Sequence, residues 1–362
     1  MKRRFLILTL AVALILSAVG CGSSAPAAEG SSEGSGGYAD FQTAIMLPGI
    51  EGENAIFQMI ASGIRDACAE LGAPEPKVVE GGDQWTSYGK YLTSLAAAGI
   101  YDVIFTTTDV MRYCVNDTVK AYPDQKIVLV DADLVGYESK FDGGKIPANV
   151  WGISFDMYQL GYLGGHFCAL VTQSSMERAN PDLKVGLVTT DIYDAWDVDL
   201  KTGFTNGVKD VNPDIEIISS VIGDWVDPAK GAAVTRALIA QGVDIVYYTS
   251  GASAYGCVTE AEAQNCYAIP HDNNSISLAP GTIIGASLVQ GYDAAYAAAK
   301  GAIEGTLEYG TGRRAGVAES VIAFTTDDPV YLETVPEDIR AAMDAAIQGL
   351  TDGTIDARRP IA

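Results

Sequence analysis

The 362-residue sequence has few of the residues on which most enzymatic chemistry depends. It contains only two histidines, His166 and His271, and no motif places a serine or cysteine nucleophile beside either of them. A Gly-x-Ser-x-Gly elbow between a strand pattern and a helix pattern, a Walker loop and a His-Glu-x-x-His zinc motif are all missing. We therefore expect no enzymatic activity, no cofactor and no bound metal ion.

Basic residues are also scarce. The chain has 23 Lys and Arg against 46 Asp and Glu, which gives a formal net charge of -23. No basic patch offsets this surplus, so nucleic acid and anionic lipid headgroups are unfavourable partners. An acidic surface of this kind is typical of a soluble exported protein.

Long hydrophobic runs are confined to the start of the chain. Lys2, Arg3 and Arg4 precede the apolar run Phe5–Leu16, which is too short for a usual spanning helix. It ends in Ser17-Ala18-Val19-Gly20-Cys21, and small residues before a cysteine resemble the lipobox of bacterial lipoproteins. We predict a signal peptide over 1–20, lipidation of Cys21, a flexible Ser/Gly-rich tether over 21–40, and an extracytoplasmic protein anchored to the cell membrane. The alternative is an ordinary secretory signal with an incidental cysteine.

Five further cysteines are spread along the chain, and an odd number cannot all pair within it. Cys68 and Cys168 lie in apolar helical patterns, which is typical of small buried hydrophobic residues. Whether any of the five forms a disulfide stays open.

The rest of the sequence alternates between short apolar runs and helical patterns. Connections of two to six residues join them, which is typical of parallel, doubly wound α/β sheets. The alternation starts again near Tyr158, so we predict two similar lobes around a cleft. The first lobe covers 41–153 and is completed by about 280–322, and the second covers 154–279 and is completed by about 323–362. The later pattern predicts strands at Ile283–Val289 and near Val317–Phe324, and Asp109 is predicted to cap the helix that ends at Tyr122.

The most informative stretch runs from Gly223 to Gly251. Asp227 followed by Pro228 predicts a helix start, and the β-branched and aromatic run Asp244–Tyr248 predicts a buried strand. Trp225 lies between the preceding strand and that helix. Ligands of open α/β sheets collect at the carboxyl ends of strands, so this stretch predicts a binding site as well as a fold.

Several stretches together resemble a known family. The run Asn212-Pro213-Asp214-Ile215-Glu216, the run from Gly223 to Gly231, and the segments Leu160–Gly165, Thr202–Lys209, Ser250–Ser253 and Tyr267–Asp272 are similar to the basic membrane protein (BMP, PnrA-like) lipoproteins. These are substrate-binding components of ABC transporters. The likeness extends from about Ala44 to about Gly349 and is strongest between Asn149 and Asp272.

The resemblance implies a type I periplasmic-binding-protein fold, in which two Rossmann-like lobes are joined by hinge strands. Members of the family mostly bind purine nucleosides or bases, with aromatic rings around the base and carboxylates plus a lysine on the ribose. Trp225 corresponds to a base-contacting aromatic residue, Asp272 to a ribose-binding aspartate, and Asp131 to another polar contact. The full set of candidate ligand-binding residues is Trp225, Asp272, Phe57, Asp131, Gly251, Trp196, Trp85, Asn273 and Gln290.

The sequence departs from the family pattern at two places. The first loop keeps Phe57 but little else of the usual Asp-Lys-Ser-Phe-Asn stretch, and Gln290 replaces the expected lysine. A base without its sugar, or another flat heterocycle, then becomes more credible than a simple nucleoside. Each candidate also has an ordinary structural role open to it: core packing for Phe57, packing at a helix start for Trp85 and Trp196, and turn geometry for Asp272 and Asn273.

The expected function is therefore that of a substrate-binding protein of an ABC importer. We expect a purine base or nucleoside as the ligand, an ABC permease and ATPase as partners, and a monomeric chain. The alternatives are another flat heterocycle such as riboflavin, a sugar, or a ligand sensor with the same fold. An exported nucleoside hydrolase would belong to another class, and only that class would release a product with time.

Overall fold

Two parallel β-sheets organise the part of the chain that the computed structural model describes, which is residues 37–82, 84–192, 195–249 and 251–361. Both sheets and the helices around them belong to the segment from Gly37 onward. The predicted signal segment 1–20, Cys21 and most of the tether 21–40 lie outside the described residues. Among the described helices, none combines the length and apolar composition needed to cross a membrane.

The first sheet has six strands in the order β11-β5-β4-β3-β1-β2, and every pairing in it is parallel. The parallel arrangement agrees with the sequence prediction, because each strand is followed by a helix or a long connection that returns the chain to the same end. Its strands are β1 (Thr43–Leu47), β2 (Lys77–Glu80), β3 (Val103–Thr107), β4 (Lys126–Val130), β5 (Val150–Phe155) and β11 (Thr311–Ala315).

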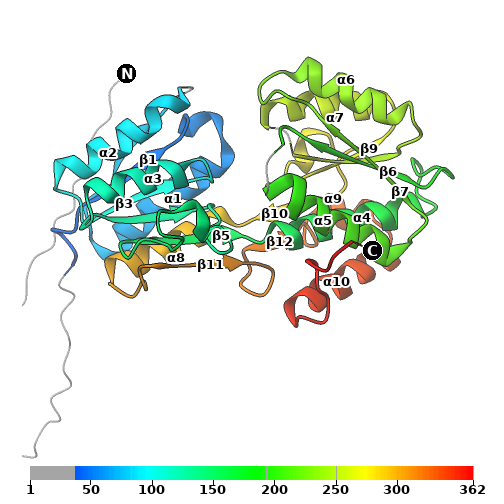
Figure 1. The fold of residues 1–362 in the computed structure, drawn as a ribbon. Coiled ribbons are helices and arrows are strands. Elements are labelled where there is room, and N and C mark those ends of the chain that lie inside the picture. The colour runs from blue at the N-terminus through cyan, green and yellow to red at the C-terminus, as the bar shows by residue number, and fades with distance from the viewer. Residues whose placement is uncertain (1–36, 83, 193–194, 250, 362) are drawn as a thin grey trace, which may run out of the picture. The chain divides into compact units, whose positions relative to one another are not determined.

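Helices cover both faces of this sheet (Figure 1). Successive side chains of a strand point to opposite faces, and in β1 Ile45 packs with one hydrophobic cluster while Met46 packs with the other. The first cluster includes α1 (Ala55–Leu71) and α8 (Gly291–Ile303), and the second includes α2 (Tyr88–Ala98) and α3 (Met111–Ala121). The inner strands of such a sheet are buried on both faces, which is why β1, β3, β4 and β5 lack polar alternation.

The second sheet has four parallel strands in the order β7-β6-β8-β9. One face packs on α4 (Met157–Thr172) and α5 (Lys201–Val211), and the other packs on α6 (Pro228–Ile239) and α7 (Ala254–Ala263). Its strands are β6 (Lys184–Thr189), β7 (Glu216–Val221), β8 (Ile245–Thr249) and β9 (Tyr267–Pro270).

Glycines allow α4 and α5 to lie unusually close. A Cβ added to Gly165 would lie 2.1 Å from the carbonyl oxygen of Phe204, and one added to Gly207 would lie 2.2 Å from that of Tyr162. A side chain at either position would therefore collide with the backbone of the other helix. The run Gly161–Gly165 is thus a packing surface inside a helix and not a dinucleotide-binding turn.

The chain passes between the two sheets three times. It leaves β5 for α4, returns through β10 (Ser287–Val289) to α8, and leaves β11 for β12 (Ile322–Phe324). β10 and β12 pair with each other in antiparallel orientation. The last helices, α9 (Pro329–Thr334) and α10 (Glu337–Thr351), follow β12, and α10 packs on α4.

Two of the predicted strands were placed too broadly. The predicted strand near Val317–Phe324 is in fact a turn followed by the short β12, and β11 lies before it at Thr311–Ala315. The predicted strand Ile283–Val289 is reduced to Ser287–Val289, with Ile283 in an isolated bridge. β11 was missed because its two arginines interrupt the apolar pattern, although a strand at the sheet edge tolerates them.

The predicted helix start at Asp227 is confirmed, and the one at Asp109 is wrong. The Asp227 carboxylate accepts hydrogen bonds from the backbone amides of Ala229 and Lys230, and Pro228 is the first residue of α6. The residue before α3 is Val110, and no side chain caps that helix. The Asp109 carboxylate instead accepts a hydrogen bond of 2.9 Å from the backbone amide of Asp133.

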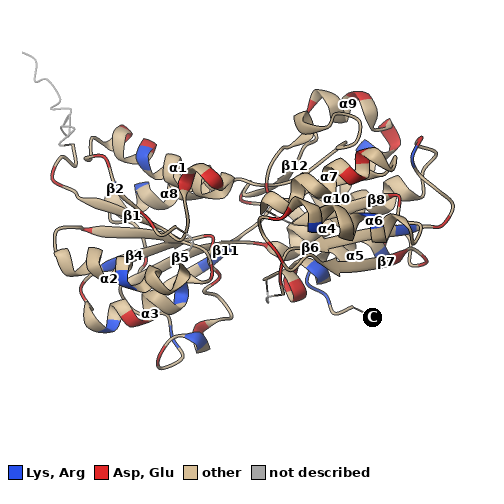
Figure 2. Ribbon diagram, turned by 90° about the horizontal axis from the view of Figure 1, so that it is seen from above, with Lys and Arg blue, Asp and Glu red and all other residues tan. Residues whose placement is uncertain are grey.

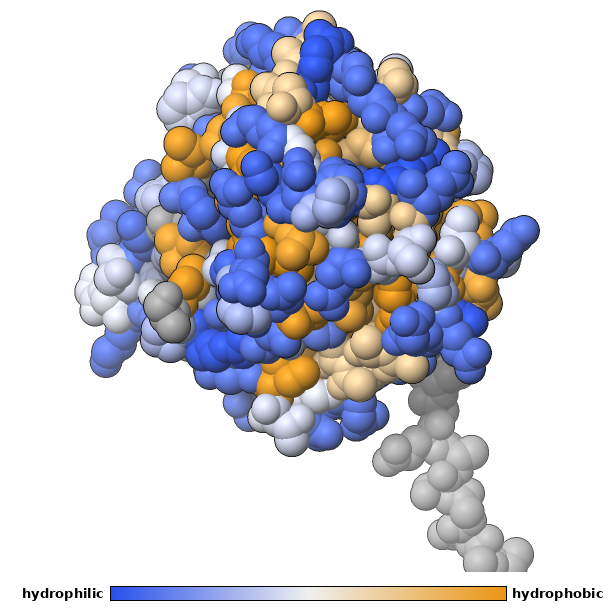
Figure 3. All heavy atoms as spheres, turned by 90° about the vertical axis from the view of Figure 1, so that its right-hand side faces the viewer, coloured by the Kyte–Doolittle hydropathy of each residue, from blue (hydrophilic) through white to orange (hydrophobic). Residues whose placement is uncertain are grey.

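Acidic residues are distributed over the helices and loops of both sheets (Figure 2). On the face shown in Figure 3, apolar residues are interspersed among hydrophilic ones. In Figure 2 the Lys and Arg positions are scattered along the described ribbon among the acidic ones.

Candidate ligand-binding site

The carboxyl edge of the four-stranded sheet carries a pair of tryptophans. Trp196 lies in a π-helical turn, η4 (Ala195–Leu200), that follows β6, and Trp225 follows β7. Their ring centroids are 5.1 Å apart with a 41° angle between the planes. Trp196 is buried, whereas Trp225 is 44% exposed. The exposed part of the Trp225 ring is therefore available for stacking, and the buried Trp196 ring packs against Trp225. π-helical turns often occur at functional sites.

His271 and Asp272 follow β9 at the same edge. The His271 ring lies perpendicular to Trp196 with a centroid distance of 6.0 Å, and its Nε2 is 2.8 Å from Asp272 Oδ1. The His271 side chain is buried and the Asp272 carboxylate is partly exposed. Asp272 also has a left-handed backbone, with φ of 79°. The histidine thus orients a carboxylate that is available to a ligand.

Gly251 fixes the path of the Trp225 loop. It begins the short helix η5 (Gly251–Ser253) and has a φ of +46°. A Cβ at this position would lie 2.9 Å from the Trp225 carbonyl oxygen and 3.3 Å from its ring. The backbone amide of Ser253 donates to the same carbonyl at 3.2 Å. Glycine is therefore needed here for both its backbone conformation and its lack of a side chain.

The carboxyl edge of the six-stranded sheet is acidic instead of aromatic. Asp131 directly follows β4 and has a φ of 61°, and Thr108 directly follows β3 with a φ of 71°. Left-handed backbone is costly for side chains such as threonine and is concentrated at functional sites. Two such residues on adjacent strands, together with Asp272 after β9 of the other sheet, make these edges the candidate site.

The Asp131 carboxyl has no hydrogen-bond or ion-pair partner among the described residues. Its burial raises its pKa well above the usual range, and the nearby charges of Asp109 and Asp272 raise the pKa further. Asp272 belongs to the four-stranded sheet, so the two carboxyl edges are close enough to interact electrostatically. A ligand that donates hydrogen bonds would give this carboxyl the partner that the protein lacks.

Two hydroxyl groups at these edges also lack a partner among the residues that the structure describes. Thr107, the last residue of β3, and Thr249, the last residue of β8, are fully buried, and no described group forms a hydrogen bond with their Oγ1 atoms. Buried polar groups are nearly always paired, so unpaired ones at strand ends point to a missing partner.

A network of charged groups supports the Asp131 loop. Asp133 accepts a hydrogen bond of 2.7 Å from Arg314 Nε, and its backbone carbonyl accepts one from Arg112. Arg112 also pairs with Asp109 at 3.4 Å. Sequence analysis missed Asp133, Arg112 and Arg314, although the Asp-x-Asp pattern after β4 gave a signal for the first of these.

Phe57 is a residue of the hydrophobic core. It is 6% exposed, and the position of a Cβ on Gly49 lies 2.6 Å from its ring. Gln290 precedes α8 and its backbone amide donates to Val321 O, while the Asn273 side chain accepts from Ser275 Oγ. The proposed ligand contacts of these three residues stay predictions.

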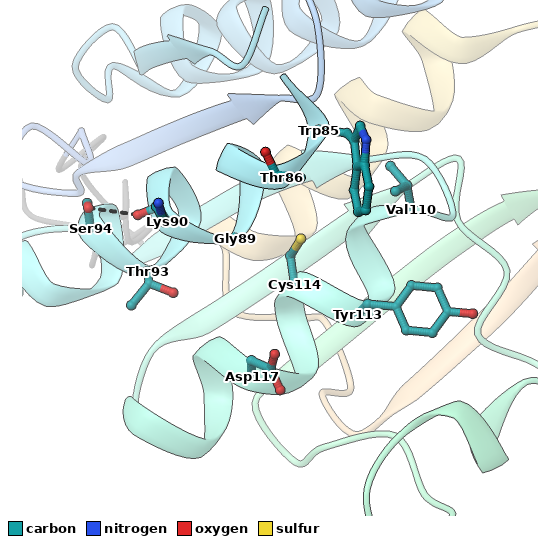
Figure 4. Close-up of a pocket in the computed structure, with 10 residues that line it drawn as sticks. All are labelled: Trp85, Thr86, Gly89, Lys90, Thr93, Ser94, Val110, Tyr113, Cys114 and Asp117. Carbon is teal, nitrogen blue, oxygen red and sulfur yellow. Dashed lines mark hydrogen bonds between the residues drawn. The ribbon is translucent and has the colours of Figure 1, made fainter. Parts of the chain in front are cut away.

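Trp85 belongs to a different surface (Figure 4). It is 69% exposed and lines a groove of about 800 Å³ between α2 and α3, in which Val110, Tyr113 and Cys114 also lie. Neither Trp196 nor Trp225 lines this groove. Within the described ranges, no group of three His, Cys, Asp or Glu residues is arranged to hold a metal ion.

Comparison with solved structures defines the class of the fold. A solute-binding protein of an ABC transporter system from Aeropyrum pernix superimposes with a TM-score of 0.70 and 22% identity, covering 87% of this chain and 92% of that one. A periplasmic ribose ABC transporter protein from Conexibacter woesei gives 0.61 and 14%, covering 80% and 93%. A transcriptional activator of the comK gene from Bacillus halodurans gives 0.68 and 20%, covering 87% and 99%. The fold is that of type I periplasmic binding proteins, as predicted.

The family follows from the sequence comparison. The family model of PnrA-like ABC transporter substrate-binding proteins (Bmp) matches residues 43–350, so the chain belongs to this family. Basic membrane protein A of Borreliella afzelii is 26% identical over 204 residues, covering 55% of this chain and 58% of that protein. A CD4+ T-cell-stimulating antigen of Listeria monocytogenes is 26% identical over 181 residues, covering 49% and 45%. The chain thus spans about half the length of the curated relatives it matches. Its family is one of substrate-binding proteins and not of enzymes.

Proposed function

We propose that this chain is the lipid-anchored, extracytoplasmic substrate-binding protein of an ABC importer and binds a purine base or nucleoside. In this proposal the six-stranded and four-stranded sheets are the cores of two lobes, and the ligand lies between their carboxyl edges. An ABC permease and ATPase are the partners, and the protein acts as a monomer held to the membrane through Cys21.

The observation that carries the proposal is the half-exposed Trp225 ring backed by Trp196 at 5.1 Å. A flat aromatic surface stacks on a planar ring, and such stacking contributes about 1–3 kcal/mol per base by alanine substitution. Stacking discriminates poorly between planar rings, so discrimination between ligands depends on the polar groups around the ring. Asp131 and Asp272, one from each sheet, provide hydrogen-bond acceptors for ring N–H groups or hydroxyls.

The negative charge of the site further restricts the class of ligand that can bind. The acidic edge carries Asp109 and Asp131, and the aromatic edge carries Asp272. A phosphate group brought close to these carboxylates would be repelled. The site therefore favours a base or nucleoside over a nucleotide.

Thermal-shift and calorimetric titration of residues 37–362 would test the proposal. This segment is one compact unit and contains every described helix and strand. Guanine, adenine, guanosine, adenosine and inosine are the expected stabilising ligands, because a ligand that binds only the native state raises Tm. AMP and GMP are matched controls and are expected to bind much more weakly.

Other outcomes would change the proposal in defined ways. A shift with riboflavin alone would keep the stacking site and replace the purine. A shift with ribose or glucose alone would favour a sugar ligand, as named for the ribose protein of Conexibacter woesei. Release of a free base from a nucleoside over time would contradict a pure binding role.

A further inference from the structure

Arg314 occupies a special place between the two edges of the site. It lies in β11 of the six-stranded sheet, and its side chain is only 22% exposed. Its Nε donates to Asp133 Oδ2 at 2.7 Å, its Nη2 pairs with the same oxygen, and Nη2 also donates to the carbonyl of Val135 at 3.1 Å. The guanidinium group thus holds the loop after β4 through several hydrogen bonds.

That loop begins with Asp131, the buried carboxyl of the proposed site. Asp133 is two residues further on, and its Oδ1 also accepts from Val135 N at 3.1 Å and from Ser154 Oγ at 3.3 Å. Its backbone amide donates to Asp109. Movement of Asp133 would therefore shift the backbone on which Asp131 is held in its left-handed conformation.

The same Nη2 atom of Arg314 also lies near a residue of the segment that follows β6 in the four-stranded sheet. Nη2 lies 4.0 Å from Asp199 Oδ2, and the Asp199 side chain is 9% exposed. Asp199 and Trp196 belong to the same six-residue π-helical turn, η4. Burial raises the pKa of Asp199, while its hydrogen bond with Tyr158 and the charge of Arg314 lower it. Arg314 is therefore the cation that helps keep this buried carboxylate ionised.

One side chain thus contacts the loop of Asp131 and the turn of Trp196. These two segments come from different sheets and carry the acidic and the aromatic parts of the site. The hydrogen bonds to Asp133 are direct, whereas the 4.0 Å separation from Asp199 is an ion pair without a hydrogen bond. Arg314 is therefore held firmly to Asp133, whereas its distance to Asp199 can change without loss of a hydrogen bond.

We propose that Arg314 is a positioning residue that sets the Asp131 loop against the Trp196 turn and thereby sets ligand affinity without touching the ligand. This inference rests on the proposed purine site. It assigns a role in that site to an arginine 181 residues away from Asp133 in the sequence.

The test uses variants that weaken the link at either end. Complete removal of Arg314 would leave the mostly buried Asp133 carboxylate without its counter-charge and could unfold the protein. Asp199→Asn keeps the shape and the hydrogen-bonding capacity toward Tyr158 but removes the charge that faces Arg314. Arg314→Lys keeps the charge but loses the planar group that bonds Asp133. Arg65→Lys is the matched control, because Arg65 binds Glu51 through two bonds of 2.6 and 2.7 Å on α1.

Two readouts separate positioning from simple stability. The first is guanosine affinity by calorimetry, and the second is amide hydrogen exchange of residues 195–200 and 131–135 in the ligand-free protein. We expect Asp199→Asn and Arg314→Lys to weaken guanosine binding about tenfold and to speed exchange in 195–200. Arg65→Lys is expected to change neither, whatever its effect on Tm.

Unchanged exchange in 195–200, or faster exchange with guanosine affinity within about twofold of wild type, would overturn the inference. If wild-type protein binds neither guanosine nor the other purines, the proposed ligand fails first. Exchange in the ligand-free variants then decides the positioning role by itself: faster exchange supports the link between the two segments, and unchanged exchange rejects it.

Discussion

The carboxyl edges of the two sheets differ in chemistry although they are built from the same β-α units. The edge of the four-stranded sheet presents Trp225, Trp196 and His271, whose rings support one another. The edge of the six-stranded sheet presents Asp131, which has no partner within the described segments, and Asp109, which pairs with Arg112. The first edge offers area for stacking and the second offers hydrogen-bond acceptors. The comparison teaches that affinity and specificity for a flat ligand can come from separate halves of one site.

The largest effect is expected from the aromatic edge. Trp225→Ala removes the exposed stacking surface and should weaken purine binding by about 1–3 kcal/mol, or about 5- to 150-fold. Stability should change little, because the side chain is 44% exposed. Calorimetric titration measures the first quantity and thermal melting the second. An unchanged affinity would move the site away from Trp225.

A smaller effect is expected from the acidic edge. Asp131→Asn should weaken binding of guanine or guanosine by about 1–2 kcal/mol, because one of the two acceptor oxygens becomes an NH2 group, which would face one of the two N–H donors that a carboxylate accepts. Burial raises the pKa of Asp131. The ionised form that accepts both bonds therefore gains population as pH rises through that pKa. Wild-type affinity should increase over this range and the affinity of the variant should stay constant.

Asp244→Asn is the matched control for a buried carboxylate outside the site. Burial raises the pKa of Asp244 from 3.8 to about 6, and its Oδ2 accepts hydrogen bonds from Thr172 and Asn180. A raised folded-state pKa contributes stability below the unfolded pKa, and this stability is lost as pH rises toward 6. The loss is up to about 3 kcal/mol. The variant should lose less stability between pH 4 and pH 7, with purine affinity unchanged. If Asp244→Asn lowered purine affinity as much as Asp131→Asn does, the loss of affinity would not depend on the position of the carboxylate, and the ligand contact proposed for Asp131 would be wrong.

Gly251 provides a weaker perturbation of the aromatic edge. Gly251→Ala places a methyl group against the Trp225 carbonyl and ring, and we expect about 1 kcal/mol of lost affinity as well as lost stability. Gly305→Ala is the control, because Gly305 has a φ of +71° and nothing within 4 Å of an added Cβ. It should lose stability alone. If the two variants had the same purine affinity in titration, the position of the Trp225 ring would not depend on Gly251.

The smallest effect is expected at Trp85. This tryptophan is more exposed than Trp225 but lines the groove between α2 and α3. Trp85→Ala should change purine affinity by less than about 0.5 kcal/mol. A loss as large as that of Trp225→Ala in the same titration would show that the acidic half of the site has an aromatic wall of its own.

Much of the fold could be predicted from local patterns. The helix start at Asp227 agrees with its prediction, and β8 agrees with the predicted buried strand Asp244–Tyr248 to within one residue, because apolar spacing and capping residues act over a few positions. β11 and the cap at Asp109 could not be predicted correctly. β11 is held by pairing with β5, and Asp109 is diverted to Asp133, so in both cases a distant partner outweighs the local preference.

The site could be predicted only in part. Trp225, Asp272, Asp131 and Gly251 follow strands at a carboxyl edge, which is a rule about position in the chain. The same rule did not separate Phe57 from Trp225, because an aromatic residue after a glycine turn can enter the core or line a ligand site. Contacts between distant segments placed Phe57 in the core.

The sequence by itself determined the class of fold, the family and the position of the aromatic edge, since these depend on residue type and spacing along the chain. Only the tertiary structure decided that His271 supports Trp196 and Asp272, that Asp131 has no partner in the part of the chain described, and that Arg314 faces both Asp133 and Asp199. Hydrogen bonds and Coulomb interactions act over a few ångströms in space. They join residues that are far apart along the chain, and the sequence separation does not indicate that these residues are in contact.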